Sequence, residues 1–365
     1  MLRGINITHV ILDEYTPMSL IQVNYVQARA CIEAAFRAQS VPYLKGSPGI
    51  GKSDIYQQIA DAWKLKLIDV RLSQCEPTDL MGFPRLNADG NKAGYSPMEM
   101  FPIEGDEIPD GYIGWLLLLD EVNHAEPPTL KAAYKVVLDR MIGPVKLHKN
   151  VLVGMAGNLD TDNAITEEMG TAMQSRISPH LELEVNTEQW LAHANKAGID
   201  YRITSFIDFR PDLLHHFEPD HTDCTYPCPR TWFKTHRYIN NKSLDDDALK
   251  DIYMPLIAGT LGEGAAIEFT SFCHIFTKLP RMADIVASPD VVAFPDAPDV
   301  IYALSGMISH NVTEATLVPA MKFIARMDMD FQALTIRNIR TRHPTLTYHA
   351  EITKWLRTNA SQLAA

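Results

Sequence analysis

The sequence has few cysteines and little positive charge, and each shortage excludes a class of protein. Its 365 residues include five cysteines, an odd number scattered along the chain. This excludes a disulfide framework and favours reduced thiols in the cytoplasm. Lysine and arginine number 33 against 45 acidic residues, which gives a net charge of −12. A broad phosphate-contacting surface for nucleic acid is therefore not expected.

Long apolar segments are missing as well. The strongest apolar run, Trp115–Leu119, is far too short to span a bilayer, and the first residues lack the apolar stretch of a signal peptide. We expect a cytoplasmic protein without a membrane segment. The composition, with 46% hydrophobic residues, is sufficient for large cores, and the length suggests about two domains.

A complete phosphate-binding loop is the most informative feature that is present. The motif G-x-x-x-x-G-K-[ST] is formed by Gly46, Ser47, Pro48, Gly49, Ile50, Gly51, Lys52 and Ser53. Its glycines let backbone N–H groups curl around a phosphate, its lysine brings a cation to the β- and γ-phosphates, and its serine can bind Mg²⁺. A short apolar segment precedes the loop and a helical pattern follows it, so the helix dipole would favour the anion. The sequence thus predicts an ATP site with Mg²⁺.

Two carboxylates complete the minimum for hydrolysis. The apolar run before Asp120 ends in Asp120-Glu121, the pattern of a Walker B motif. Asp120 can hold Mg²⁺ and Glu121 can polarise the attacking water. The alternative is a solvated acidic pair after a strand.

Three further polar residues have the right places for catalysis. Asn158 ends a buried strand pattern, Val151–Asn158, that can lie between the two earlier strands, and would reach the γ-phosphate or the water. Arg176 precedes the last strand and could enter a neighbouring subunit's site as an arginine finger. Arg230 begins a helix of the second domain and could reach the phosphate across a cleft. The alternatives are a turn-forming asparagine, a surface arginine and an ordinary arginine at the start of a helix.

The order of strand and helix patterns predicts an α/β fold. Short apolar strands alternate with helices as far as Val185, which is typical of a doubly wound parallel sheet, and after Asn186 almost every pattern is helical. Gly82–Gly114 and Arg140–Lys149 are predicted to contain hairpins. We expect an αβα nucleotide-binding domain over residues 1–185, an α-helical lid over 186–290 and a helical C-terminal extension over 291–365.

Taken together, the motifs resemble those of the MoxR family of AAA+ ATPases, over about residues 40–240. The resemblance rests on Gly-Ser-Pro-Gly-Ile-Gly-Lys-Ser, Leu-Leu-Leu-Leu-Asp-Glu-Val-Asn-His-Ala, Gly-Asn, Ser-Arg and Pro-Arg-Thr-Trp, in this order. Leu80–Arg85 and Phe209–Leu214 also resemble the branch that contains the CbbQ and NorQ chaperone-like ATPases. His124 departs from the family, which often has an arginine there, and this puts the contact of that arginine in question. Residues from about 280 onward match nothing in the family.

The resemblance implies a five-stranded αβα domain with a helical lid, hydrolysis of Mg-ATP and a homo-oligomeric ring, usually hexameric. It assigns Lys52, Ser53, Asp120 and Glu121 as Walker residues, Asn158 as sensor 1, Arg176 as the arginine finger and Arg230 as sensor 2. It also implies chaperone-like remodelling or activation of a protein client, and a partner with a von Willebrand factor A domain. Two alternatives remain: a nucleic-acid-associated AAA+ motor or loader, and a nucleotide-gated assembly scaffold.

Overall fold

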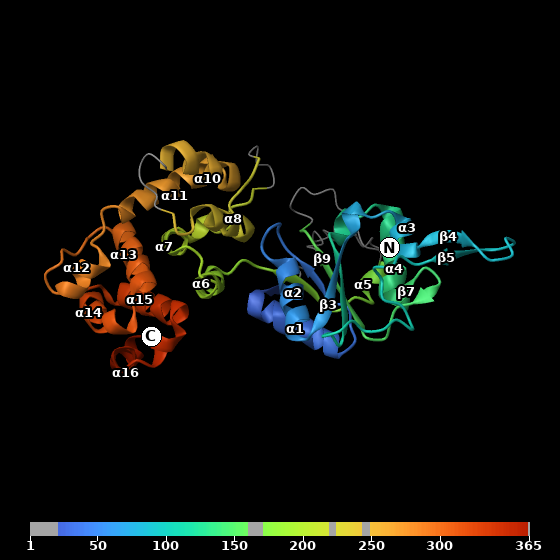
Figure 1. Ribbon diagram of the computed structural model, residues 1–365, viewed down its shortest axis with the longest axis horizontal. Helices are drawn as coiled ribbons and strands as arrows, with labels where there is room; N and C mark the ends of the chain where they lie inside the picture. The colour runs from blue at the N-terminus through green and yellow to red at the C-terminus, as the bar shows by residue number, and fades with distance from the viewer. Residues whose placement is uncertain (1–20, 160–170, 219–223, 243–248, 364–365) are drawn as a thin grey trace, which may run out of the picture.

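The computed structural model describes residues 21–159, 171–218, 224–242 and 249–363. It has two parts, a sheet covered by helices and a purely helical part, joined after Leu183 (Figure 1). The first 20 residues of the predicted αβα domain lie outside the described ranges. The predicted domain boundaries stay a prediction.

The first part is built on a six-stranded parallel sheet in the order β1-β10-β2-β9-β6-β3. Its strands are β1 (Ile21–Val23), β2 (Tyr43–Lys45), β3 (Leu65–Arg71), β6 (Gly114–Asp120), β9 (Val151–Gly157) and β10 (His180–Leu183). The predicted α/β class is confirmed, but the sheet has one strand more than the five expected. The additional strand, β1, spans only three residues and is formed by pairing with β10, about 160 residues away, so no local pattern marks it.

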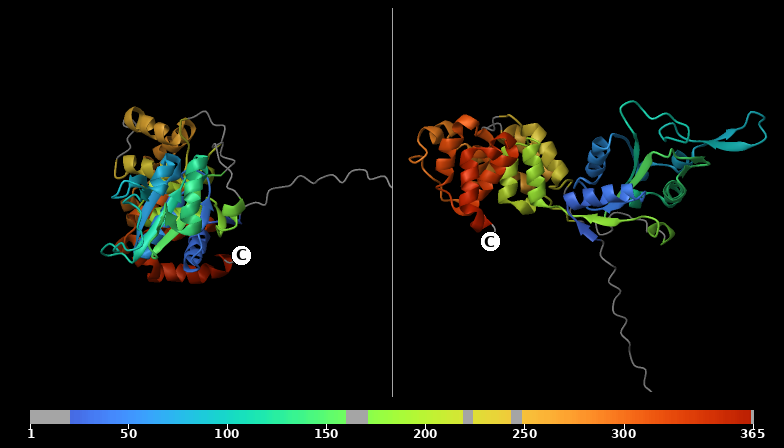
Figure 2. Two further views of the ribbon diagram at one scale, coloured as in Figure 1. Left: turned by 90° about the vertical axis from the view of Figure 1, so that its right-hand side faces the viewer. Right: turned by 90° about the horizontal axis from the view of Figure 1, so that it is seen from below.

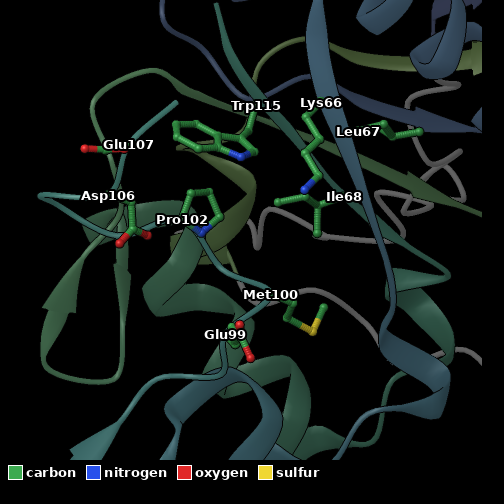
Figure 3. A pocket seen from close by; sticks show the side chains of 9 residues that line it. All are labelled: Lys66, Leu67, Ile68, Glu99, Met100, Pro102, Asp106, Glu107 and Trp115. Atoms are coloured by element: carbon green, nitrogen blue, oxygen red, sulfur yellow. The ribbon is translucent and has the colours of Figure 1, made fainter. Parts of the chain in front are cut away.

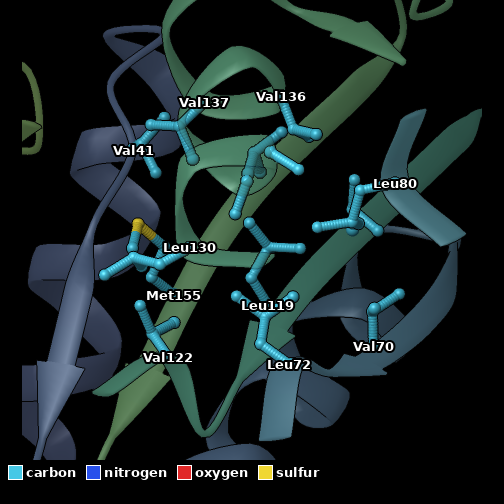
Figure 4. Close-up of a cluster of buried hydrophobic side chains, with 14 of the residues drawn as sticks. Val41, Val70, Leu72, Leu80, Leu119, Val122, Leu130, Val136, Val137 and Met155 are labelled. Atoms are coloured by element: carbon cyan, nitrogen blue, oxygen red, sulfur yellow. The ribbon is translucent and has the colours of Figure 1, made fainter. Parts of the chain in front are cut away.

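Helices cover both faces of this sheet. They are α1 (Tyr25–Arg37), α2 (Lys52–Ala62), α3 (Pro77–Met81), α4 (Pro127–Asp139) and α5 (Thr171–Gln174). Every side chain of Leu116–Leu119 in β6 is fully buried, alternately against α1 and α2 on one face and against α4 on the other. Figure 4 shows the α4 face, with Leu119 beside Leu130. Successive strand residues point to opposite faces, so a continuous leucine run is what a doubly covered strand requires.

Two hairpins interrupt the first part, as the sequence predicted. Strands β4 (Phe83–Leu86) and β5 (Ala93–Ser96) form one, and β7 (Met141–Ile142) and β8 (Val145–Lys146) form the other. The β4–β5 hairpin projects from the body of the molecule (Figures 1 and 2). It exposes three large apolar side chains, those of Phe83, Leu86 and Tyr95. Apolar groups on a projecting hairpin are suited to contact with another protein.

Apart from loops and the 3₁₀ turns Pro211–Leu213 and Pro344–Tyr348, the described residues of the second part form helices. They are α6 (Thr187–Lys196), α7 (Tyr201–Phe209), α8 (Pro229–Ile239), a π-helical turn (Leu249–Tyr253), α10 (Met254–Leu261), α11 (Glu263–Phe276), α12 (Met282–Ala287), α13 (Pro298–Asn311), α14 (Glu314–Ile324), α15 (Met329–Arg342) and α16 (Ala350–Leu363). One apolar core is formed around Phe206, Trp232 and Phe269, and a second around Leu304, Phe323 and Ile339. Helix α13 contributes to both cores. None of the described helices has the length and apolar character needed to cross a membrane.

A buried polar cluster fixes α15 against α7. The Asp208 carboxylate accepts hydrogen bonds from Arg337 Nη2 at 3.0 Å and from Asn338 Nδ2 at 3.1 Å. Burial raises the pKa of Asp208 to about 6. Arg342 Nη2 donates to Thr204 Oγ1 at 2.8 Å, and burial lowers the pKa of Arg342 to about 10. These bonds join α15, one of the C-terminal helices, to α7 of the predicted lid.

Candidate nucleotide-binding site

The phosphate loop lies at the carboxyl end of β2 and leads directly into α2. Gly49 and Gly51 have φ values of +80° and +100°, in the left-handed region that favours glycine. Gly49 is also approached closely by the predicted lid, because a Cβ there would lie 2.6 Å from Cys228 Sγ. Glycine at position 49 therefore allows both the curvature of the loop and its close contact with the helical part.

Lys52 is held inside the loop. Its side-chain nitrogen donates to the carbonyl oxygens of Gly46 at 2.6 Å and Ser47 at 3.0 Å, and to Asn158 Oδ1 at 2.9 Å. An ammonium group has three donors, which these acceptors match. The residue is only 8% exposed. Its charge is therefore concentrated at the mouth of the loop, where an entering phosphate would compete with the carbonyl oxygens.

Ser53 and Asp120 lie side by side, although 67 residues separate them. The Ser53 hydroxyl donates to Asp120 Oδ2 at 2.6 Å, and Asp120 Oδ1 accepts from the backbone N–H of Glu121 at 2.8 Å. Both are hard oxygen ligands, which Mg²⁺ prefers, and Mg²⁺ needs only one or two protein ligands beside phosphate. Within the described residues no group of three or more histidine, cysteine or acidic side chains could hold a metal. As two hard oxygen donors, Ser53 and Asp120 fit Mg²⁺, which would take its other ligands from phosphate and water.

Glu121 is oriented by its backbone and by a serine. It has φ +55°, an uncommon value for a non-glycine residue, at the start of the turn η2 (Val122–His124). Its carboxylate accepts a hydrogen bond from Ser73, which follows the neighbouring strand β3. Burial, and next the charge of Asp120, raise the pKa of Asp69 on the same strand. The sequence did not identify Ser73; its only signal is a hydroxyl residue after a strand.

Asn158 follows β9, which lies between β2 and β6 as the sequence predicted. Besides Lys52, its side chain contacts His124, at 3.5 Å between Asn158 Nδ2 and His124 Nδ1. Its main chain is paired with the buried side chain of Asn123. The strand order therefore brings three motifs together at the carboxyl ends of the strands. Two further residues lie beside them, Asn123 and His124, to which sequence reasoning gave no role.

A cavity of about 690 Å³ lies between this edge and the helical part. It is lined by the loop residues Gly49–Ser53 on one side and by α6 and α8 on the other. Arg230 lines it, and its backbone N–H donates to Gly49 O at 3.1 Å. Trp190 and Phe233 also line it, packed edge to face with ring centroids 6.2 Å apart. The structure thus places Arg230 opposite the phosphate loop of its own chain, as a contact across the cleft requires.

His215 is a further group on the helical side. Its Nε2 is buried and has no hydrogen-bond partner among the described residues. Burial lowers its pKa, and the charge of Lys52 and that of His216 lower it further. The loop that carries it is bonded to the segment before Arg230 through His216 N–H and Pro227 O, 3.0 Å apart.

Arg176 lies at the amino end of the strands, opposite the end that carries the phosphate loop. It is exposed, in the turn between α5 and β10, where its backbone N–H donates to Met173 O at 3.0 Å. Strand β10 runs parallel to β2, so a residue before β10 and a loop after β2 lie at opposite ends of the strands. Four strand residues span roughly 13 Å. Arg176 is not among the residues that line the cavity.

A second hollow, of about 490 Å³, lies beside the edge strand β3 (Figure 3). Lys66, Ile68 and Trp115 line its sheet side, and Glu99, Asp106 and Glu107 are among the residues that line it from a loop. None of the predicted site residues lines it. Of the two hollows, only the larger one is lined by the phosphate loop and Arg230.

No family model matches the chain, and no curated protein matches its sequence. Several solved structures are distantly similar. A presumed ATPase from Cytophaga hutchinsonii is 13% identical, with 92% of this chain and 87% of that chain covered and a TM-score of 0.34. A mutant of RuvB from Thermotoga maritima is 14% identical, with 81% and 85% covered and a TM-score of 0.35. NtrX from Brucella abortus in complex with ADP is 13% identical, with 92% and 67% covered and a TM-score of 0.38. These similarities are too distant to assign the chain to a family.

Proposed function

We propose that the protein is a Mg-dependent ATPase of the AAA+ class and of MoxR type. One observation carries this proposal: three adjacent strands, β2, β9 and β6, bring a phosphate loop, an amide and a pair of carboxylates to one edge of a parallel sheet. Ligands of open α/β sheets bind beyond the carboxyl ends of the strands. Hydrolysis of a phosphoanhydride needs these groups: a phosphate cradle, a metal anchor and a residue that activates water.

Each group has a definite task in this reaction. The loop N–H groups and Lys52 bind the phosphates. Glu121 takes up a proton of the attacking water as the water oxygen bonds to the γ-phosphorus and the bond from that phosphorus to ADP breaks, which gives ADP and phosphate. Ser53 and Asp120 would hold Mg²⁺, which neutralises charge that develops on the phosphate oxygens. The aromatic pair Trp190 and Phe233 offers an apolar wall to the rest of the nucleotide.

We further propose that the active form is a homo-oligomeric ring, hexameric as in the family that the sequence resembles. The place of Arg176 supports this, since it precedes β10 and so lies at the end of the strands opposite the phosphate loop of its own chain. In a ring it would reach the loop of a neighbour. The projecting β4–β5 hairpin, with its exposed apolar side chains, supports a role in remodelling a protein client. A von Willebrand factor A domain protein is the partner that we propose to test first.

The phosphate loop is tested by replacing its lysine. Wild type should hydrolyse ATP in the presence of Mg²⁺, and Lys52→Ala should lose turnover by roughly 10²-fold or more, because the main cation at the phosphates is removed. Lys131→Ala, at an exposed position of α4, is the matched control and should keep wild-type activity. Released phosphate is the measured quantity. Equal turnover of wild type and Lys52→Ala would contradict the proposal.

A further inference from the structure

Strand β3 lies at one edge of the sheet and is paired on one side only. It pairs with β6 over all seven of its residues, and no other strand of the described residues lies next to it. An edge strand presents a row of main-chain N–H and C=O groups to which a further extended chain can be added. With seven residues against three in β1, β3 is the longer of the two edge strands.

The hollow of about 490 Å³ lies at this edge (Figure 3). Three consecutive residues of β3, Lys66–Ile68, line it. Because successive side chains of a strand point to opposite faces of the sheet, a hollow that contacts all three must extend around the edge of the strand. Leu67 and Ile68 pack on the cores of opposite faces, and both are only half-buried. An added strand would cover both side chains.

The other wall of the hollow is a loop, residues 97–113, that is fixed to the β7–β8 hairpin. The backbone N–H of Glu104 donates to Lys146 O at 2.9 Å, and the backbone N–H of His148 donates to Pro102 O at 3.0 Å. The hollow is therefore held open by main-chain bonds before anything binds. Such a preformed site reduces the entropy lost when a ligand binds.

This loop is strongly acidic. It contains no lysine, arginine or histidine, and its carboxylates are those of Glu99, Glu104, Asp106, Glu107 and Asp110. Glu99, Asp106 and Glu107 line the hollow, and within the described residues none of these three forms an ion pair. Lys66 is the one basic residue that lines the hollow. The negative charge is thus in excess there and favours a cationic partner.

We propose that β3 binds an extended, basic segment of another protein as an additional strand of the sheet. The main chain of this segment would hydrogen-bond to the outer edge of β3, which is the mode of strand addition. The acidic loop packs on the same face of the sheet as Ile68, and Leu67 lies on the other face. Lysine or arginine at alternate positions would therefore meet the carboxylates, and apolar residues between them would cover Leu67.

This surface is separate from the nucleotide site, because none of the predicted site residues lines the hollow. The inference therefore goes beyond the proposed ATPase and does not depend on it. A protein that binds the basic segment but hydrolyses no ATP would contradict the ATPase alone.

A synthetic peptide tests the proposal. The probe is a fluorescein-labelled peptide of alternating lysine and valine, as long as β3, and the anisotropy is measured with the full chain at low ionic strength. We expect saturable binding. The same peptide with every peptide nitrogen methylated keeps its charges but has no N–H donors, and should bind roughly tenfold more weakly or worse. No saturable binding of the first peptide, or equal binding of the methylated one, would overturn the proposal.

Substitutions on the two walls of the hollow should change the affinity in opposite directions. Glu99→Gln combined with Glu107→Gln should weaken binding of the unmethylated peptide by roughly 3- to 10-fold, because two exposed ion pairs are lost. Lys66→Gln removes a repulsive charge and should strengthen binding about twofold. Glu104→Gln, on the same loop but not lining the hollow, is the matched control and should bind as wild type does. Unchanged affinity of the double variant, or weaker binding by Lys66→Gln, would contradict a basic partner.

Discussion

Arg230 and Arg176 lie toward opposite ends of the strands of the parallel sheet. Of the two, only Arg230 lines the same cavity as the phosphate loop. Arg230 is bonded through its backbone to Gly49 of its own chain. Arg176 precedes β10 at the far ends of the strands. Arg230 and the phosphate loop line one cavity within a subunit, whereas Arg176 lies at the other end of the strands, where we propose that it serves the site of a neighbouring subunit. Oligomerisation thereby becomes part of the catalytic proposal.

The largest effect should come from Arg176→Ala, which we expect to lower kcat by roughly 10³- to 10⁵-fold, as loss of an arginine finger does. Mixing Arg176→Ala with Lys52→Ala subunits should restore part of the activity, because some interfaces then pair an intact loop with an intact arginine. Phosphate release is measured against the fraction of Lys52→Ala subunits. Arg357→Ala, on α16, is the matched control and should match wild type.

No rescue in mixed oligomers that demonstrably form would contradict a finger acting between subunits. Full activity of Arg176→Ala alone would remove the catalytic difference between the two arginines. After either result, Arg176 and Arg230 would differ in their positions but not in a demonstrated catalytic role.

A smaller effect is expected from Arg230→Ala. Charge-assisted hydrogen bonds contribute about 1.5–3 kcal/mol, so the dissociation constant for ATP should rise roughly 10- to 100-fold. The affinity for ADP should change less if Arg230 contacts the terminal phosphate. Arg237→Ala, two turns further along α8 and on the same cavity, should have the smaller effect of the two.

The affinity for a fluorescent ATP analogue can also be measured in subunits that carry Arg176→Ala. This substitution removes any contribution of the neighbour's arginine to binding. Arg230→Ala should still weaken binding there. If the loss disappears in that background, Arg230 acts through the interface and not within its own chain.

The sequence predicts those parts of the molecule whose signals are local. The spacing of the glycines around Lys52 and the leucine run before Asp120 follow from adjacent residues, and the place of the Asn158 strand between theirs follows from the usual layout of such sheets. The hairpins are marked by turn residues between short strands. Such features depend on the curvature of the backbone and on the alternation of side chains along a strand, and both are determined by a few consecutive residues.

Contacts between distant residues could not be predicted in this way. The strand β1 exists through pairing with β10, and the Ser73–Glu121 bond joins the ends of two strands. Asn158 likewise meets Lys52 and His124, which lie 106 and 34 residues away in the chain. In the C-terminal helices the periodicity predicts helices, but the bond from Asp208 to Arg337 is fixed only by packing.

The most direct test of the central claim is the turnover of Glu121→Gln. This change keeps the size of the side chain and removes the base that accepts the proton from water. We predict that the variant binds ATP as tightly as wild type and that kcat falls by roughly 10²- to 10⁴-fold. Wild-type turnover in Glu121→Gln would contradict the account of this edge of the sheet as an ATPase site.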